Sequence, residues 1–191
     1  MGGREVDERS QAWYGAMRAG DERAFEALFH AHYAPLCRFL REYLRSPAVI
    51  EELVQDLFLR LWRDRARLPV RGSVRAYLYV SARNSALNHL RHERFVRRLQ
   101  SRWAAGDREP SLEPGARTPE GEAAAHELAG AIRSAIQSLP ERARLAATLR
   151  WEHQLSYAEI AEIMEISVKG VENQLGRIMK ALRPALEPFH S

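Results

Sequence analysis

The sequence predicts an all-α protein made of two small helical domains joined by a flexible linker. Apolar residues recur at helical spacing through most of the chain, and no stretch shows the alternation of a strand. The segment AAGDREPSLEPGARTPEG, residues 104–121, interrupts this pattern with three prolines and three glycines. Such a composition is typical of a linker. We therefore expect an N-terminal extension (1–20), a first domain (21–100), a linker (101–125) and a second domain (126–189).

The charge of the chain is unevenly distributed. Residues 1–103 carry 19 arginines against 12 acidic residues, residues 104–125 have a net charge of −3, and the remainder is neutral. A basic first half favours a polyanionic partner. The single cysteine, Cys37, excludes an intrachain disulfide, and no apolar run has the length of a membrane span or a signal sequence. We expect a cytoplasmic protein without membrane insertion.

Three helices are expected in the first domain. Asp21 is a suitable N-cap for the first, which Pro35 should kink or break. Ser46 and Pro47 begin the second. Residues 67–73, RLPVRGS, form a loop, and the third helix runs from about Val74 beyond Arg94. The apolar face of the second helix comprises Ile50, Leu53, Val54, Leu57, Phe58, Leu61 and Trp62.

After the linker we expect helices over 122–138 and from Pro140 onwards, then a short helix at Tyr157–Met164, a tight turn and a last helix over 168–182. The final pair has the pattern of a helix-turn-helix. Ala161 is small where the helices cross, Ile166 fills the turn, and Ser167 is a good N-cap. The last helix should bury Val168, Val171, Leu175, Ile178 and Leu182.

The opposite face of the last helix carries polar side chains suited to DNA. Asparagine, glutamine and arginine read base edges in the major groove, and arginine and lysine also bind phosphates. A solvated outer face of a three-helix core is the structural alternative. The candidate DNA-binding residues are Lys169, Glu172, Asn173, Gln174, Arg177 and Lys180.

A basic, aromatic segment precedes the linker. Ten arginines and one acidic residue lie between Arg65 and Arg102, interleaved with aromatic residues. Arginines that hold the backbone and rings that stack on bases suit single-stranded nucleic acid. Tyr77 and Tyr79 are two residues apart and face different ways on a helix, so at least one of them could belong to the core.

The sequence offers little for catalysis. HELAG, which begins at His126, has glycine where a zinc-binding HExxH helix needs its second histidine. No glycine-rich phosphate loop is present in the sequence. We expect no enzymatic activity, no metal site and no cofactor.

Three segments together resemble the extracytoplasmic-function group of sigma-70-type RNA polymerase sigma factors. EELVQDLFLRLW is similar to the segment of region 2 that docks on the clamp helices of the beta-prime subunit. SVRAYLYVSARNSALNHLRHER resembles the promoter-melting segment, and LPERAR with the helix-turn-helix resembles region 4, which reads the −35 element. The resemblance covers residues 21–183 in the family's order.

The resemblance implies a role for each set of candidate residues. Residues implied to dock on the polymerase, through exposed apolar groups and one carboxylate, are Gln55, Asp56, Phe58, Leu61 and Trp62. Residues implied to engage and melt the −10 region are Arg71, Arg75, Tyr77, Tyr79, Arg83, Asn84, Asn88 and Arg91. The implied partners are core RNA polymerase (its beta-prime clamp helices and beta flap), duplex and single-stranded promoter DNA, and an anti-sigma factor.

The chain departs from the family pattern at four positions. Tyr77 stands where many members have tryptophan, Asn88 replaces aspartate, Glu165 replaces a glycine of the turn, and Gly170 replaces threonine. A left-handed Glu165 would cost on the order of 1 kcal/mol. Two other classes of function stay open from the residues alone: an autonomous helix-turn-helix regulator with a sensor or dimerisation domain, and an adaptor that binds proteins without reading DNA.

Overall fold

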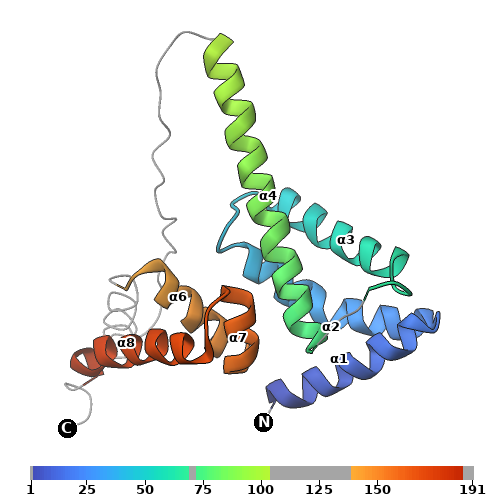
Figure 1. The fold of residues 1–191 in the computed structure, drawn as a ribbon, viewed down its shortest axis with the longest axis horizontal. Coiled ribbons are helices and arrows are strands. Elements are labelled where there is room, and N and C mark those ends of the chain that lie inside the picture. Colours follow the sequence, from blue (N-terminus) through green and yellow to red (C-terminus); the bar gives the residue numbers. More distant parts are fainter. Residues whose placement is uncertain (1, 69–71, 104–138, 187–191) are drawn as a thin grey trace, which may run out of the picture.

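Every regular element in the described part of the chain is a helix, which confirms the all-α prediction (Figure 1). The computed structural model describes residues 2–68, 72–103 and 139–186. Residues 104–125 of the predicted linker and the predicted helix over 122–138 lie outside these ranges, as do residues 69–71 of the predicted loop, Arg71 among them. Residues 101–103, which were expected in the linker, are the last residues of α4. The domain boundaries drawn from the sequence stay predictions.

Four helices form the first domain: α1 (Gly2–Arg18), α2 (Glu22–Leu40), α3 (Pro47–Arg63) and α4 (Val74–Trp103). Each contributes an apolar stripe to one core, and burial of such stripes is the main favourable term in folding. Residues at the centre of this core, all 1 % exposed or less, include Met17, Leu28, Leu36, Phe39, Leu40, Val54, Phe58, Leu61 and Leu78.

The predicted helix starts are confirmed by their caps. The Asp21 carboxylate accepts hydrogen bonds from the backbone N–H groups of Arg23 and Ala24, at 2.9 and 3.2 Å. Ser46 caps α3, with Pro47 in its first turn. Of the two expectations for Pro35, a break is wrong, because α2 continues through it to Leu40, and a kink stays a prediction. The flanking core residues are fully buried, and this packing offsets the hydrogen bond that proline removes.

Helix α1 belongs to the first domain, although its sequence suggested no role. Ser10, Tyr14 and Met17, spaced as one helical face, are buried against the rest of the bundle. The Tyr14 hydroxyl donates to the Leu68 carbonyl at 2.6 Å. Helix α1 therefore secures the chain just after α3.

Ser10 also determines which ring nitrogen of the buried His32 carries the hydrogen. Its hydroxyl donates to the Val6 carbonyl at 2.6 Å, so its oxygen accepts from Nε2–H of His32 at 2.7 Å. Burial, followed by the charge of Arg75, lowers the pKa of His32 to about 4. His32 is therefore neutral in the folded protein at pH 7, with its hydrogen on Nε2.

The second domain comprises α6 (Glu141–Ala147), a π-helical turn η1 (Thr148–Glu152), α7 (Tyr157–Met164) and α8 (Val168–Leu186). Leu149, Leu155, Ile160, Ile163 and Ile178 form its fully buried centre. The helix expected after Pro140 is thus divided into α6 and η1. The wider turn ends with the N–H of His153 bonded to the carbonyl of Thr148, five residues earlier.

Helix α4 determines how the two domains meet. Its C-terminal half projects beyond the bundle, whereas its N-terminal half packs against α7 of the second domain (Figure 1). The helix predicted from the basic segment is the longest described element, with 30 residues. It is also the helix of the first domain against which α7 packs.

Replacing Ser10 by alanine should destabilise the protein by about 1–3 kcal/mol, because Nε2–H of His32 would stay buried without an acceptor. The measurement is the free energy of unfolding in urea at pH 7.5. The double variant Ser10→Ala/His32→Leu removes donor and acceptor together and should regain part of this loss. A cost below about 0.5 kcal/mol for Ser10→Ala would contradict the assigned hydrogen bond.

Candidate nucleic-acid and docking interfaces

The helix-turn-helix is built by two strong caps and one left-handed residue. Ser156 and Glu159 form a reciprocal capping box at the start of α7. Glu165 ends this helix with φ 55° and ψ 46°, a conformation that costs a residue with a side chain on the order of 1 kcal/mol. The Ser167 hydroxyl then accepts from the N–H of Gly170 at 3.0 Å and caps α8. The predicted cap at Ser167 is confirmed.

Helix α8 presents its predicted polar face to solvent. Lys169, Glu172, Asn173, Arg177 and Lys180 are exposed, and Gln174 is half-buried. Lys169 pairs with Glu172 at 2.9 Å within the same face. The prediction that Val168 belongs to the core is wrong, since it is 43 % exposed. It is the first residue of α8.

The residues expected to engage the −10 region form two stripes on α4. Arg75, Tyr79 and Arg83 follow one another at steps of four residues and lie on one face. Residues 77, 84, 88 and 91 occupy another face, on which Asn84, Asn88 and Arg91 are exposed and Tyr77 is half-buried. We call these the 75–79–83 stripe and the 77–84–88–91 stripe.

The second domain covers the 75–79–83 stripe. Arg75, only 6 % exposed, donates to the backbone carbonyls of His153 and Gln154. Tyr79 is 1 % exposed, with its hydroxyl 2.9 Å from Nδ1 of His153. Its ring also packs on Phe39, so of the two tyrosines it is Tyr79 that belongs to the core.

Two further contacts extend this interface along α4. Ser73, at the start of the helix, places its hydroxyl 2.5 Å from a carboxylate oxygen of Asp7 and 3.1 Å from one of Glu159. One turn beyond Tyr79, Arg83 forms an ion pair with Glu165 at 2.8 Å. A hollow of about 180 Å³ between the domains is lined by residues that include His32, Arg38, Arg75 and His153.

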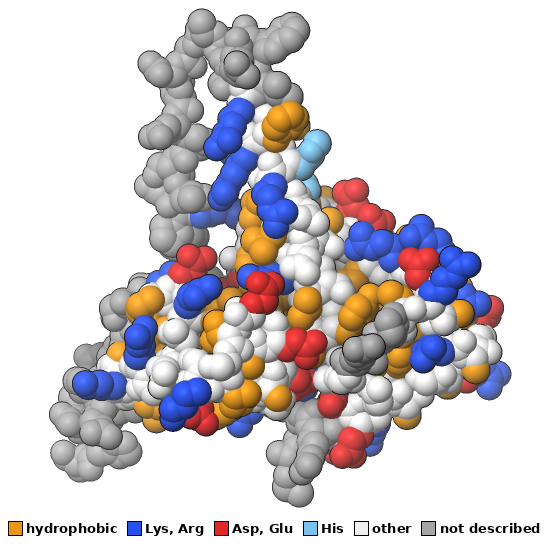
Figure 2. All heavy atoms as spheres, in the orientation of Figure 1, with side chains coloured by type: hydrophobic (Ala, Val, Ile, Leu, Met, Phe, Trp, Pro, Cys, Tyr) orange, Lys and Arg blue, Asp and Glu red, His pale blue; other side chains and the backbone are white. Residues whose placement is uncertain are grey.

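The projecting half of α4 keeps a basic surface. Arg91, Arg94, Arg97 and Arg98 are exposed there, and Phe95 is 60 % exposed beside them. Figure 2 shows the blue side chains gathered along this part of the helix. Arginines interleaved with an exposed ring match the pattern expected for a strand of nucleic acid.

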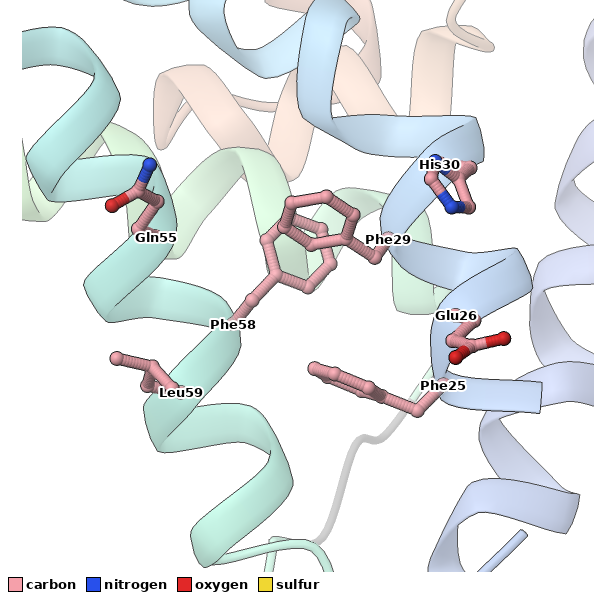
Figure 3. A pocket seen from close by; sticks show the side chains of 7 residues that line it. All are labelled: Phe25, Glu26, Phe29, His30, Gln55, Phe58 and Leu59. Carbon is pink, nitrogen blue, oxygen red and sulfur yellow. The ribbon is translucent and has the colours of Figure 1, made fainter. Parts of the chain in front are cut away.

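An apolar groove lies between α2 and α3. Phe25 and Phe29 of α2 point toward Phe58 of α3, and Leu59 stands at the open side (Figure 3). The ring centroids of Phe29 and Phe58 are 4.9 Å apart in an edge-on contact. The groove encloses about 410 Å³, and Gln55 lines its rim.

This groove corrects one expectation about the docking residues. Phe58 and Leu61 were expected to be exposed, but each is only 1 % exposed because it lies on the core face of α3. Gln55 and Asp56 are exposed, and Trp62 is half-buried with the Arg65 guanidinium 4.0 Å over its ring. Leu59, which is 65 % exposed, was not among the docking residues expected from the sequence. Because Leu59 lies outside the apolar repeat of α3, its position in the sequence already indicated an exposed apolar side chain.

Features of other classes of site are absent from the described residues. Within them, no three His, Cys, Asp or Glu side chains gather closely enough to hold a metal ion. Of the helices that the structure describes, none is long and apolar enough to cross a membrane. The groups with strongly shifted pKa values are instead His32, Tyr79 and His153, which lie at or near the contact between the domains.

The chain matches two consecutive family models: sigma-70 region 2 over residues 28–96 and sigma-70 region 4 over residues 129–182. It is 28 % identical over 188 residues to the RNA polymerase sigma-H factor of Pseudomonas aeruginosa, covering 96 % of this chain and 97 % of that protein. It is 29 % identical over 178 residues to the extracytoplasmic-function sigma-E factor of Escherichia coli K12, covering 91 % and 92 %.

Solved structures show the same fold. CnrH in complex with the cytosolic domain of CnrY aligns with a TM-score of 0.59 and 22 % identity, over 94 % of this chain and 98 % of that one. The sigma factor RpoE in complex with the anti-sigma factor NepR from Bartonella quintana aligns with a TM-score of 0.55 and 18 % identity, over 85 % and 96 %.

This chain belongs to the extracytoplasmic-function group of sigma-70-type sigma factors. The family resemblance expected from the sequence is confirmed, and with it the general role of a sigma factor in transcription.

His153 should stay neutral at pH 6, where an exposed histidine is mostly protonated. Burial, then Arg38 and Arg75, lower its pKa from 6.5 to about 4. Between pH 6.5 and 4 the folded protein therefore binds fewer protons at this histidine than the unfolded chain does. The free energy of unfolding is unaffected by His153 above pH 6.5 and decreases as the pH falls from 6.5 toward 4. NMR of ¹⁵N-labelled imidazoles measures the titration, with His153→Phe assigning the signal. Titration near pH 6.5 would contradict the buried position.

Proposed function

We propose that this protein binds core RNA polymerase and directs it to particular promoters by recognising their −35 and −10 elements and melting the −10 region. The observation that carries the proposal is the combination in one chain of a helix-turn-helix with a polar outer face and a long basic helix. One element suits duplex DNA and the other suits a separated strand. The protein would act in the cytoplasm as a specificity subunit without catalysis of its own.

Helix α8 would enter the major groove at the −35 element. Its exposed face offers Asn173 and Arg177 to base edges and Lys169 and Lys180 to phosphates. Because Lys169 already pairs with Glu172, a phosphate that binds this lysine would have to replace an exposed carboxylate. Such an exchange costs little, since exposed ion pairs contribute little stability.

Helix α4 would bind and separate the −10 region. Asn84, Asn88 and Arg91 are exposed in the free protein. The projecting half adds a further exposed group, which comprises Arg94, Phe95, Arg97 and Arg98. Arg71 and the 75–79–83 stripe would add to this surface. Flipping a base out of the stack costs a few kcal/mol, which stacking and pocket hydrogen bonds offset.

The groove between α2 and α3 would dock on the beta-prime clamp helices. Leu59 offers an exposed apolar side chain above three phenylalanines, while Gln55 and Asp56 supply polar specificity at the rim. Phe58 and Leu61 would act from beneath, by holding α3 in place. The beta flap and an anti-sigma factor are further proposed partners; the latter draws support from the complex of RpoE with the anti-sigma factor NepR.

The double change Lys169→Ala/Arg177→Ala should lower promoter-specific transcription about tenfold or more, because contacts to duplex DNA are lost. Run-off transcription with core polymerase measures this, and a pull-down should show unchanged binding to the polymerase. The control Arg23→Ala/Arg41→Ala removes equal charge from exposed positions on or next to α2 and should keep full activity. Equal loss in both variants would count against −35 recognition by α8.

Leu59→Arg should weaken binding to core polymerase about tenfold or more, because an apolar contact is replaced by a charge at the open side of the groove. Val6→Arg, at an exposed apolar position on α1, is the matched control. Fluorescence anisotropy of the labelled protein gives both affinities. If the wild-type protein did not bind core polymerase but bound duplex DNA alone, the proposed function would be wrong and the protein would be an autonomous regulator.

A further inference from the structure

Two helices contain an exposed glycine that the fold itself does not require. Glycine inside a helix is less stable than alanine, because the unfolded chain gains more conformational freedom. Gly15 in α1 and Gly176 in α8 are exposed, and an added Cβ atom would meet nothing within 4 Å at either position. Neither has the positive φ of Gly20 and Gly72. The fold would therefore accept a side chain at both positions.

Gly176 differs from Gly15 in what surrounds it. Residues three or four positions apart are neighbours on a helix surface. On this rule Gly176 lies between Glu172 and Asn173 on one side and Lys180 on the other, all of which are exposed. These three residues belong to the polar face of α8 that is proposed to meet the −35 element. The position without a side chain is thus a gap inside this face, whereas α1 carries no residue proposed to bind DNA.

The place of Gly176 along α8 indicates which part of a DNA duplex would fill this gap. The residue lies in the third turn of the helix, which begins at Val168, and is about 12 Å along the axis at 1.5 Å per residue. The major groove is also about 12 Å wide. A recognition helix places its N-terminal residues on base edges. Its third turn then reaches the edge of the groove, where the sugar-phosphate backbone runs.

We propose that Gly176 is a positioning residue of the −35 contact, because its missing side chain lets the sugar-phosphate backbone at the edge of the major groove lie close to α8. Lys180, one turn further along the same face, binds a phosphate of this strand. A side chain at position 176 holds the helix away from the backbone and lengthens that contact. The inference rests on the proposed function, in which α8 binds duplex DNA.

Two side chains of different size at position 176 test the proposal. Gly176→Ala adds a small side chain and Gly176→Leu a large one, and both residues favour helices. Each full-length variant is bound to core polymerase, and fluorescence anisotropy gives the affinity of the complex for a duplex that carries the −35 element of a promoter transcribed by the wild-type complex. The affinity should fall about threefold for alanine and about tenfold or more for leucine, with binding to the polymerase unchanged.

The same changes at Gly15 are the matched control. Gly15→Ala and Gly15→Leu should leave the affinity for the duplex unchanged. Gly15→Ala and Gly176→Ala should both raise the midpoint of thermal unfolding, because alanine is the better helix former. A loss of DNA binding by a variant that is more stable than the wild-type protein cannot come from damage to the fold.

The outcomes separate this inference from the proposed function. If Gly176→Leu bound the duplex as tightly as the wild-type protein, Gly176 would be a tolerated surface residue like Gly15 and the inference would be wrong. Contacts to the backbone carry no sequence information, so the order of preference among altered −35 sequences should stay the same in Gly176→Ala. A changed order would place a base edge at the gap and overturn the assignment to the backbone. If the wild-type complex preferred no promoter duplex, the proposed function itself would fail.

Discussion

The buried guanidinium of Arg75 is the interaction on which the arrangement of this protein depends. A buried cation is costly unless its donors find acceptors, and here the acceptors are the carbonyls of His153 and Gln154 in the other domain. These carbonyls are within reach because η1 widens the helix after α6 and Gln154 takes a left-handed conformation. The irregular backbone at η1 and Gln154 thus provides the carbonyl acceptors that the buried charge of Arg75 requires.

The same interaction affects the neighbouring groups. Burial, together with the charge of Arg75, lowers the pKa of both His32 and His153. Both imidazoles are therefore neutral, and a neutral ring costs less to bury than a charged one. Tyr79 completes the contact with His153. Helix α4 consequently has one face packed against the rest of the protein, one face exposed to solvent and a basic end that projects beyond the bundle. A helix that must bind a partner transiently benefits from this division, because its stability does not depend on the exposed faces.

Much of the fold could be predicted because its signals are local. Asp21, Ser46, Ser156 and Ser167 each begin a helix where the sequence placed one, and the apolar repeats define the core faces. Helix α1 could have been found by the same reasoning, since Ser10, Tyr14 and Met17 share a helical spacing. Its polar sequence hid the signal.

The remaining features depend on contacts between distant residues. Phe58 and Leu61 match both a core face and a docking face by sequence, and only their packing shows that they are core. Arg75 and Arg83 were expected on nucleic acid from their charge and from the family resemblance. That each meets a carbonyl or carboxylate more than 70 positions away follows from the arrangement of the domains, which periodicity does not encode.

The central claim is the proposal that the exposed face and the basic end of α4 bind the −10 strand of promoter DNA. The most direct measurement compares the affinity of a labelled single-stranded −10 oligonucleotide with that of a scrambled strand, for the complex of this protein with core polymerase. We expect at least a tenfold preference for the −10 strand. Equal affinity for the two strands would contradict the claim.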